Sequence, residues 1–215
     1  MNVINKGTNI QSYWNEKHKR EYDLDKPYDN NAILNSKNSY HFVAGEIIRE
    51  NKDEIKIKKI LEIGCAGGNF LFYVKTLIAP EFECIGEDFS HSAIEAANNR
   101  AGLDCVNFQC VDILENPIQK DYGIICVFEV LEHIEEGQNF KILDNMLDHC
   151  EYLIISVPTT KDSCFGEHIS HYNWDTFEKN NYNVLWKARL DKIDMSNIGD
   201  NGDYFHFISL IKGKV

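Results

Sequence analysis

Three acidic side chains, Glu62, Asp88 and Asp112, stand at or near the ends of three short apolar segments of the chain. If these segments are parallel strands, their carboxyl ends meet at one edge of a sheet, where open α/β sheets bind ligands. A carboxylate at the end of the second strand, about 20 residues past a glycine-rich turn, is placed to accept hydrogen bonds from both hydroxyls of a ribose. The three acids therefore predict a crevice for a ribose-containing ligand.

The first acid precedes a run of small residues in the segment ILEIGCAGGNF, residues 60–70, where a strand turns into a helix. Small residues let the backbone approach a ligand, and the helix N-terminus offers free N–H groups. Counted from Gly64, the run lacks the second and third glycines of the dinucleotide fingerprint GxGxxG. Glu62 would also repel a pyrophosphate but suits a cationic amino-acid group. A nicotinamide dehydrogenase is therefore disfavoured.

Each acid also has a plainer interpretation. The glycine turn can exist without a ligand, and Asp88 can simply cap a helix that begins near Ser90. Glu87 is an alternative partner for the ribose. Asp112 in isolation resembles a solvated carboxylate at a strand end.

Three histidines are candidates for a general base. A reaction in which an alcohol is the nucleophile needs such a base, whereas one with a phenol or an amine does not. His168 and His171 lie in a long loop after the fifth apolar segment, and His133 follows the fourth. Alternatively, His133 supports the glycine-rich turn, and His168 and His171 are surface or helix-capping residues. His168 and His171 with Glu167 also have weak metal-ligand spacing without a third partner, so we expect no metal.

Apolar patterns position these residues on an alternating series of elements. Strands are expected at 57–63, 82–87, 106–110, 122–128 and 152–157, and helices at 39–51, 69–79, 90–102 and 140–149. Such alternation predicts a parallel sheet covered by helices on both faces. The runs at 184–195 and 204–212 have no helix between them and predict an antiparallel hairpin at the sheet edge. The fold class is therefore α/β, a Rossmann-like three-layer sandwich with a mostly parallel seven-stranded sheet.

Two motifs resemble those of class I S-adenosylmethionine-dependent methyltransferases. ILEIGCAGGNF resembles their first motif, with Ala66 in place of its middle glycine. FEVLEHI, residues 128–134, resembles the EVLEH signature of small-molecule enzymes grouped with ubiquinone-biosynthesis O-methyltransferases. The resemblance covers roughly residues 40–180.

The resemblance implies S-adenosylmethionine as cofactor, with S-adenosylhomocysteine as product. It implies that Asp88 binds the ribose and that Asp112, with the backbone N–H of the next residue, binds the adenine. The full implied set for the cofactor is Glu62, Gly64, Cys65, Ala66, Gly68, Asp88, Phe89, Asp112, Ile113 and Glu129.

The N-terminal segment, residues 1–38, is polar and rich in aromatic residues, and we expect it to be a helical lid or substrate segment on a methyltransferase domain of residues 39–215. Tyr13, Trp14, Tyr28 and Trp174 are candidates for the acceptor pocket, although ordinary packing explains them equally well. The basic run at residues 17–20 is either an anion site or a solvated helix face.

The net charge and the cysteine content indicate which binding partners and which cellular compartment to expect. A net charge of −12 disfavours nucleic acid and anionic membranes. The seven cysteines form no CxxC pair and predict reduced thiols. We see no targeting segment and expect a cytoplasmic, bacterial protein, a monomer or a homodimer.

The predicted reaction is O-methylation of a small molecule, and the expected acceptor is a sugar or a phosphorylated precursor of a bacterial surface polysaccharide. An N- or C-methyltransferase acting on an amine or a quinone-like molecule stays open. So does a non-catalytic protein that binds S-adenosylmethionine.

Overall fold

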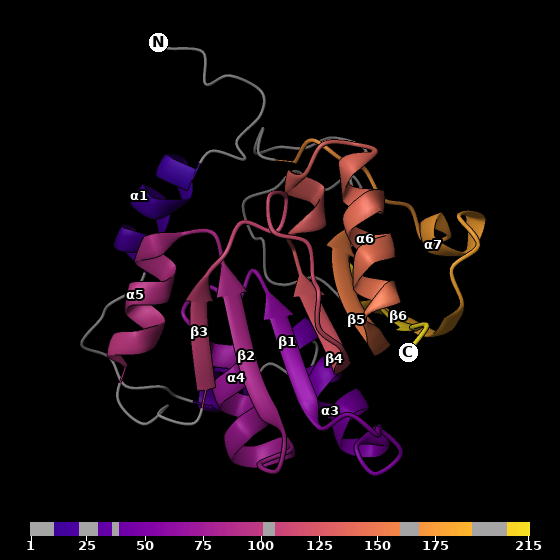
Figure 1. Cartoon of the computed structure of the whole chain (residues 1–215), viewed down its shortest axis with the longest axis horizontal. Helices are drawn as coiled ribbons and strands as arrows, with labels where there is room; N and C mark the ends of the chain where they lie inside the picture. The colour runs from indigo at the N-terminus through magenta and orange to yellow at the C-terminus, as the bar shows by residue number, and fades with distance from the viewer. Residues whose placement is uncertain (1–10, 22–29, 36–38, 101–105, 160–167, 191–205) are drawn as a thin grey trace.

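The computed structural model describes residues 11–21, 30–35, 39–100, 106–159, 168–190 and 206–215. Its centre is a seven-stranded sheet with the order β3-β2-β1-β4-β5-β7-β6 (Figure 1). The strands are β1 (Lys59–Ile63), β2 (Glu83–Asp88), β3 (Val106–Cys110), β4 (Tyr122–Phe128), β5 (Cys150–Pro158), β6 (Val184–Leu190) and β7 (His206–Lys212).

The five strands β1 to β5 run parallel, and β7 pairs antiparallel with both β5 and β6. The predicted fold class is thus confirmed, with the last strand inserted beside β5 and β6 left at the edge. Residues 191–205, the expected turn of this hairpin and parts of its two strands, lie outside the described residues.

The helices and helical turns are α1 (Gln11–Glu21), α2 (Asn31–Leu34), α3 (Tyr40–Asn51), α4 (Asn69–Tyr73), η1 (Val74–Ile78), α5 (His91–Asn99), η2 (Leu131–His133), α6 (Gln138–Asp148) and α7 (Thr176–Lys179). Ser39 and Ser90 cap α3 and α5 as predicted, because each hydroxyl accepts a hydrogen bond from the backbone three residues on. The expected helix at 69–79 is instead one α-helical turn followed by the π-helical turn η1. Gly102, the expected end of α5, lies outside the described residues.

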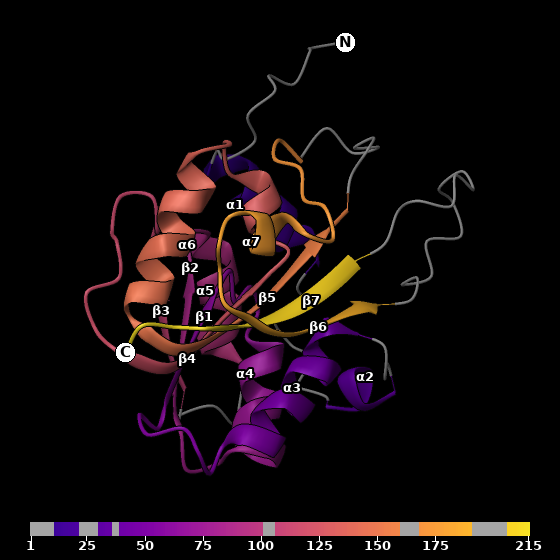
Figure 2. The same ribbon diagram turned by 90° about the vertical axis from the view of Figure 1, so that its right-hand side faces the viewer.

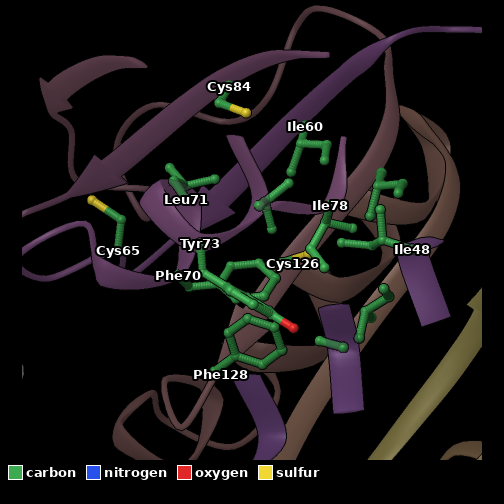
Figure 3. Packing of buried hydrophobic residues seen from close by; sticks show 14 of the residues in the cluster. Ile48, Ile60, Cys65, Phe70, Leu71, Tyr73, Ile78, Cys84, Cys126 and Phe128 are labelled. Atoms are coloured by element: carbon green, nitrogen blue, oxygen red, sulfur yellow. The ribbon is translucent and has the colours of Figure 1, made fainter. Parts of the chain in front are cut away.

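Two hydrophobic clusters lie on the two faces of the sheet. One packs α3, α4 and α5 against alternate strand residues, and the other packs α6 and α7 against the opposite face. Figure 2 shows these two helical layers on either side of the strands. In the first cluster, Phe70 of α4 packs edge-on against Phe128 of β4 at 4.9 Å between ring centres (Figure 3). This contact fixes the start of α4 above the carboxyl end of β4.

Among the described residues, no helix has the length and apolar character that crossing a bilayer requires. Of the cysteines in that part of the chain, Cys65, Cys84, Cys126 and Cys150 are buried thiols and Cys110 is an exposed one.

Candidate functional site

A cavity of about 280 Å³ opens at the carboxyl ends of β1, β2, β3 and β4. Its wall includes the predicted residues Glu62, Gly64, Cys65, Ala66, Asp88, Phe89, Asp112, Ile113, Glu129, His133 and Trp14. The expected crevice therefore lies where the alternating pattern placed it, since parallel strands bring their ends to one edge.

The turn after β1 approaches the cavity with an unusual backbone. Gly64, Ala66 and Gly68 all have positive φ, at 72°, 49° and 78°. A Cβ on Gly64 would lie 2.3 Å from a methyl carbon of Val130, so only glycine fits there. Gly68 precedes α4 and does not line the cavity, so its contribution is to shape the turn.

Asp88 ties this turn to the end of β2. Its Oδ2 accepts a hydrogen bond from the Ala66 backbone N–H at 3.0 Å, and its Oδ1 accepts one from the Ser90 N–H at 2.8 Å. Burial raises the pKa of Asp88 to about 6, although these two hydrogen bonds oppose the shift. Each oxygen keeps a lone pair that a ligand hydroxyl can use. Asp88 thus serves the helix start and still faces the cavity.

Glu62 is the strongest sign that this cavity binds a cation. The side chain is only 3% exposed, and its Oε2 has no hydrogen-bond partner among the described residues. Burial, and then the nearby Asp88 carboxylate, raise the pKa of Glu62 well above its ordinary value. A buried carboxylate without a partner is costly, and an ammonium group from a ligand would satisfy it. The amino-acid end of S-adenosylmethionine carries such a group, so the residues fit the implied cofactor.

The third acid, Asp112, lies on the cavity wall beside Ile113, as expected for contacts to an adenine. Its Oδ1 accepts a hydrogen bond from the Leu114 backbone N–H at 2.9 Å, which fixes the turn after β3. Glu87, the alternative ribose partner, also lines the cavity.

Helix α1 closes part of the cavity from the N-terminal side. Trp14 and His18 line the wall, and the Trp14 ring lies 5.0 Å from that of His133. The helix is held by Asn15, whose side-chain oxygen accepts a hydrogen bond from the Ser90 hydroxyl at 2.9 Å. Figure 1 shows α1 beside α5, on the side to which the strand arrows point.

Two histidines on this wall, His18 and His41, were not among the predicted cofactor or catalytic residues, although His18 belongs to the basic run at residues 17–20. Burial lowers the pKa of His41 to about 4, and burial together with Lys17 lowers that of His18 to about 4. Both imidazoles are therefore neutral at pH 7. The only signal for His41 in the sequence was its place in the helical pattern of residues 39–51, which does not indicate a cavity.

The structure separates the three predicted bases. His133 lines the cavity, and the His168 ring lies 5.1 Å from it, just beyond the wall. His171 is exposed and does not line the cavity. Most of the preceding loop, residues 160–167, lies outside the described residues.

Beside this histidine pair lie two acids, the partly buried Glu129 and the fully buried Glu132. Glu129, with φ of 54°, accepts a hydrogen bond from Ser156 Oγ at 2.7 Å, and its other oxygen lies 2.6 Å from His206 Nδ1. Burial, and then Glu129, raise the pKa of Glu132 well above its ordinary value. His206 comes from β7, near the other end of the chain, and nothing in its local sequence indicated this contact.

The four residues predicted to form the acceptor pocket do not all lie at the cavity. Of the four, Trp14 lines the cavity. Tyr13 packs edge-on against Trp14 at 5.5 Å and does not line the wall. Trp174 is 38% exposed and does not line the cavity; its ring packs against Phe207 and lies under the Lys187 ammonium. Tyr28 lies outside the described residues.

Comparison with known proteins gives one family match, to a methyltransferase domain over residues 60–151. A malonyl-[acyl-carrier protein] O-methyltransferase of Bacillus cereus is 26% identical over 125 residues, which cover 57% of this chain and 44% of that protein. A ubiquinone biosynthesis O-methyltransferase of Coxiella burnetii is 31% identical over 109 residues, covering 49% of this chain and 42% of that protein. The match thus spans less than half of each relative.

Solved structures share the whole fold at low identity. A magnesium protoporphyrin IX methyltransferase from Synechocystis, solved with bound SAM, superposes with a TM-score of 0.67 at 11% identity, covering 99% of this chain and 100% of that one. The N-methyltransferase NodS from Bradyrhizobium japonicum, with S-adenosyl-L-homocysteine, gives 0.63 at 19% identity, covering 93% and 98%. These likenesses show the fold, and the family match supports S-adenosylmethionine as the cofactor.

Proposed function

We propose that this chain, whose residues 60–151 match a methyltransferase domain, transfers the methyl group of S-adenosylmethionine to a hydroxyl group of a small molecule. The observation that carries the proposal is Glu62, a buried carboxylate with an unpartnered oxygen on the wall of a cavity that Asp88 and Asp112 also line. Three carboxylates at three successive strand ends match a ligand with an ammonium group, a ribose and an adenine.

The bound cofactor supplies an electrophilic methyl group on a sulfonium, which leaves as a neutral thioether. The chain therefore has to hold the acceptor in line and exclude water. Phe128 and His133 line the cavity at and just after the end of β4, and the Trp14 ring packs against His133. This is where we place the acceptor.

A hydroxyl acceptor is favoured because a histidine lies at that end. His133 is 12% exposed at its side chain and lines the cavity, so its position suits a group that helps remove the hydroxyl proton. The two curated relatives described above are named as O-methyltransferases, which agrees with this choice.

A sugar or a phosphorylated precursor of a surface polysaccharide is our proposed acceptor class. Lys17 Nζ lies 4.5 Å from the centre of the Trp14 ring, and Trp14 lines the cavity. A cation behind this wall residue, in a chain of net charge −12, suits an acceptor that carries a phosphate.

Calorimetric titration with S-adenosylhomocysteine tests the cofactor part. We expect saturable binding by the wild type and at least tenfold weaker binding by Asp88→Ala, because charge-assisted hydrogen bonds to the ribose are lost. Asp88→Asn keeps the side-chain shape and checks that the loss does not come from a collapsed turn. Asp121→Ala, which removes a carboxylate paired with His149 away from the cavity, is the matched control.

Absence of binding by folded wild-type protein would contradict the proposal. The acceptor part is tested by measuring S-adenosylhomocysteine release with hydroxyl acceptors, including sugar phosphates, and with amines of similar size. Turnover of the amines alone would show that the protein is an N-methyltransferase.

A further inference from the structure

Three side chains beside the acceptor end of the cavity have the chemistry and spacing of a metal site. The ligand atoms of Glu132, His133 and His168 all lie within 4.8 Å of one another. His133 also lines the cavity, so an ion bound by this group would be next to the proposed acceptor.

Glu132 provides the independent sign of a ligand. The residue is only 1% exposed, and neither carboxylate oxygen has a hydrogen-bond partner among the described residues. The His133 Nε2 lies 3.9 Å from its Oε1, beyond hydrogen-bond distance. Because an unpartnered buried carboxylate is costly, such a group is normally paired or bound to a metal.

The surrounding backbone holds the three ligands together. Glu132 and His133 are consecutive residues of η2, and the Glu132 carbonyl accepts hydrogen bonds from the N–H groups of Ile169 and Ser170 at 2.8 and 3.0 Å. These two bonds place His168 directly beside η2. The Ser170 hydroxyl adds a hydrogen bond to the Ile134 carbonyl. A ligand cluster positioned by such outer contacts is preorganised for an ion.

The charge around the cluster also favours a cation. Glu129 stands at the same end of β4, and its carboxylate accepts a hydrogen bond from Ser156 Oγ and lies 2.6 Å from His206 Nδ1. Glu129 thus has partners within the protein, whereas the buried Glu132 carboxylate has no hydrogen-bond partner among the described residues. A divalent ion would supply Glu132 with that partner.

We propose that Glu132, His133 and His168 bind one divalent first-row transition-metal ion, which in turn binds the oxygen of the methyl acceptor. Two imidazoles and one carboxylate suit Zn²⁺, Mn²⁺ or Fe²⁺ better than Mg²⁺ or Ca²⁺. Three protein ligands leave open positions for an acceptor, as in catalytic sites. Metal–ligand bonds of about 2.1 Å require the side chains to close by about 1 Å.

The inference rests on the proposed function and names how its acceptor is activated. An acceptor hydroxyl bound to the ion has a lowered pKa and releases its proton to solvent. Its oxygen lone pair then forms the bond to the methyl carbon, while the sulfur–methyl bond breaks and its electron pair stays on sulfur. His133 and His168 then act as ligands, and the acceptor class narrows to hydroxyl compounds, especially those with a second oxygen for the ion.

The sequence-based expectation of no metal considered His168 with His171 and Glu167. The structure shows why that spacing was uninformative, because His168 lies beside His133 and Glu132, two residues from a different part of the chain.

Calorimetric titration with Zn²⁺ alone, after dialysis against EDTA, tests the site. We expect one ion per chain, with at least tenfold weaker binding by Glu132→Gln and by His168→Ala. His91→Ala removes an exposed histidine at the start of α5 and should bind as the wild type does. Co²⁺ in place of Zn²⁺ should give visible absorption bands that the Glu132→Gln protein lacks.

The Glu132→Gln variant also shows whether a loss of metal binding comes from the lost ligand or from misfolding. Removing a buried, unpartnered charge should leave the metal-free protein as stable as the wild type or more so, while abolishing any rise of Tm with Zn²⁺. Folded wild-type protein that binds no Zn²⁺, Mn²⁺ or Co²⁺, or equal metal affinity in wild type and both ligand variants, would overturn the proposal.

S-adenosylhomocysteine titrations of the same samples separate this inference from the proposed function. Nucleoside binding without metal binding would leave the methyltransferase proposal standing and remove only the ion. Loss of nucleoside binding by the folded wild type would instead remove the proposed function, and with it the role given to the ion.

Discussion

The two ends of the cavity are built in different ways. The end formed by β1, β2 and β3 takes each functional group from the last residues of a strand, as with Glu62 and Asp88, or from the turn directly after it, as with Asp112. The end formed by β4 and β5 takes its groups from segments far apart in the chain, as with Trp14, His168 and His206. The first end therefore depends on local backbone shape, and the second on the docking of distant segments.

This difference predicts where substitutions act. At the first end, a change in the turn should affect cofactor binding and folding together, because the same backbone atoms serve both. At the second end, a change in a docking contact should reduce stability while leaving cofactor affinity nearly unchanged.

The largest expected effect is that of Gly64→Ala at the first end. A Cβ there meets the Val130 side chain at 2.3 Å, and the φ of 72° is unfavourable for any residue with a side chain. Strain and overpacking together should cost about 3 kcal/mol of unfolding free energy. Urea unfolding measures the loss, and S-adenosylhomocysteine titration should show binding at least tenfold weaker. Gly137→Ala, where a Cβ meets nothing within 4 Å but φ is also positive at 90°, isolates the backbone part.

The first end of the cavity was easy to predict because it depends on local backbone shape. The three acids, the glycine turn and the helix caps at Ser39 and Ser90 are local signals, because each depends on neighbours within a few residues. The positions of the strands and the mostly parallel sheet also followed from the alternation of apolar segments, whereas the order of the strands in the sheet was not predicted. Helix 69–79 was less well predicted, because its second half is a π-helical turn and apolar spacing does not distinguish that turn from an α-helix.

The second end could not be predicted to the same degree. No local pattern links Glu132 to His168 or Glu129 to His206, since these contacts arise only when β5 and β7 take their places in the sheet. Aromatic residues were equally ambiguous. Trp14 lines the cavity and Trp174 does not, although both were proposed on the same grounds.

Glu62→Gln should give the next largest effect, with opposite signs for binding and stability. The glutamine cannot pair as strongly with a ligand ammonium, so S-adenosylhomocysteine should bind at least tenfold more weakly. The raised pKa of Glu62 means that its charged form destabilises the fold above the ordinary pKa of glutamate, so the variant should unfold at a higher urea concentration at pH 7. Loss of both affinity and stability would show that Glu62 has an internal partner.

The pH dependence of cofactor binding should report Asp88. Its pKa of about 6 lies above the ordinary value of 3.8, so in the free protein the charged form is disfavoured and stability falls as pH rises from about 4 to about 6. Ribose hydroxyls donate to the charged form, so affinity should rise with pH by up to about tenfold per unit below pH 6 and then level. Asp88→Asn should remove the part of the profile centred near pH 6, and Glu62 accounts for any dependence that persists.

At the second end, Tyr172→Phe should reduce stability alone. The Tyr172 hydroxyl accepts a hydrogen bond from Asn139 Nδ2 at 2.7 Å, and Tyr172 is a buried residue of the same segment that carries His168. Losing this bond and leaving the amide unsatisfied should cost about 1 to 2 kcal/mol in urea unfolding. The affinity for S-adenosylhomocysteine should change less than twofold. A larger change would mean that the two ends of the cavity are coupled.

The smallest expected effect belongs to Ala66→Gly, which tests whether the first end carries backbone strain. Ala66 has φ of 49°, a region where a Cβ is costly, and it stands where the resembling motif has glycine. Glycine removes that strain but loses more conformational entropy on folding, so the net gain in unfolding free energy should be below about 1 kcal/mol. The Ala66 N–H still donates to Asp88 in the variant, so cofactor affinity should be unchanged. A loss of affinity without a loss of stability would instead show that the alanine methyl group contacts the ligand, and the local shape of this turn would then not be enough to explain binding.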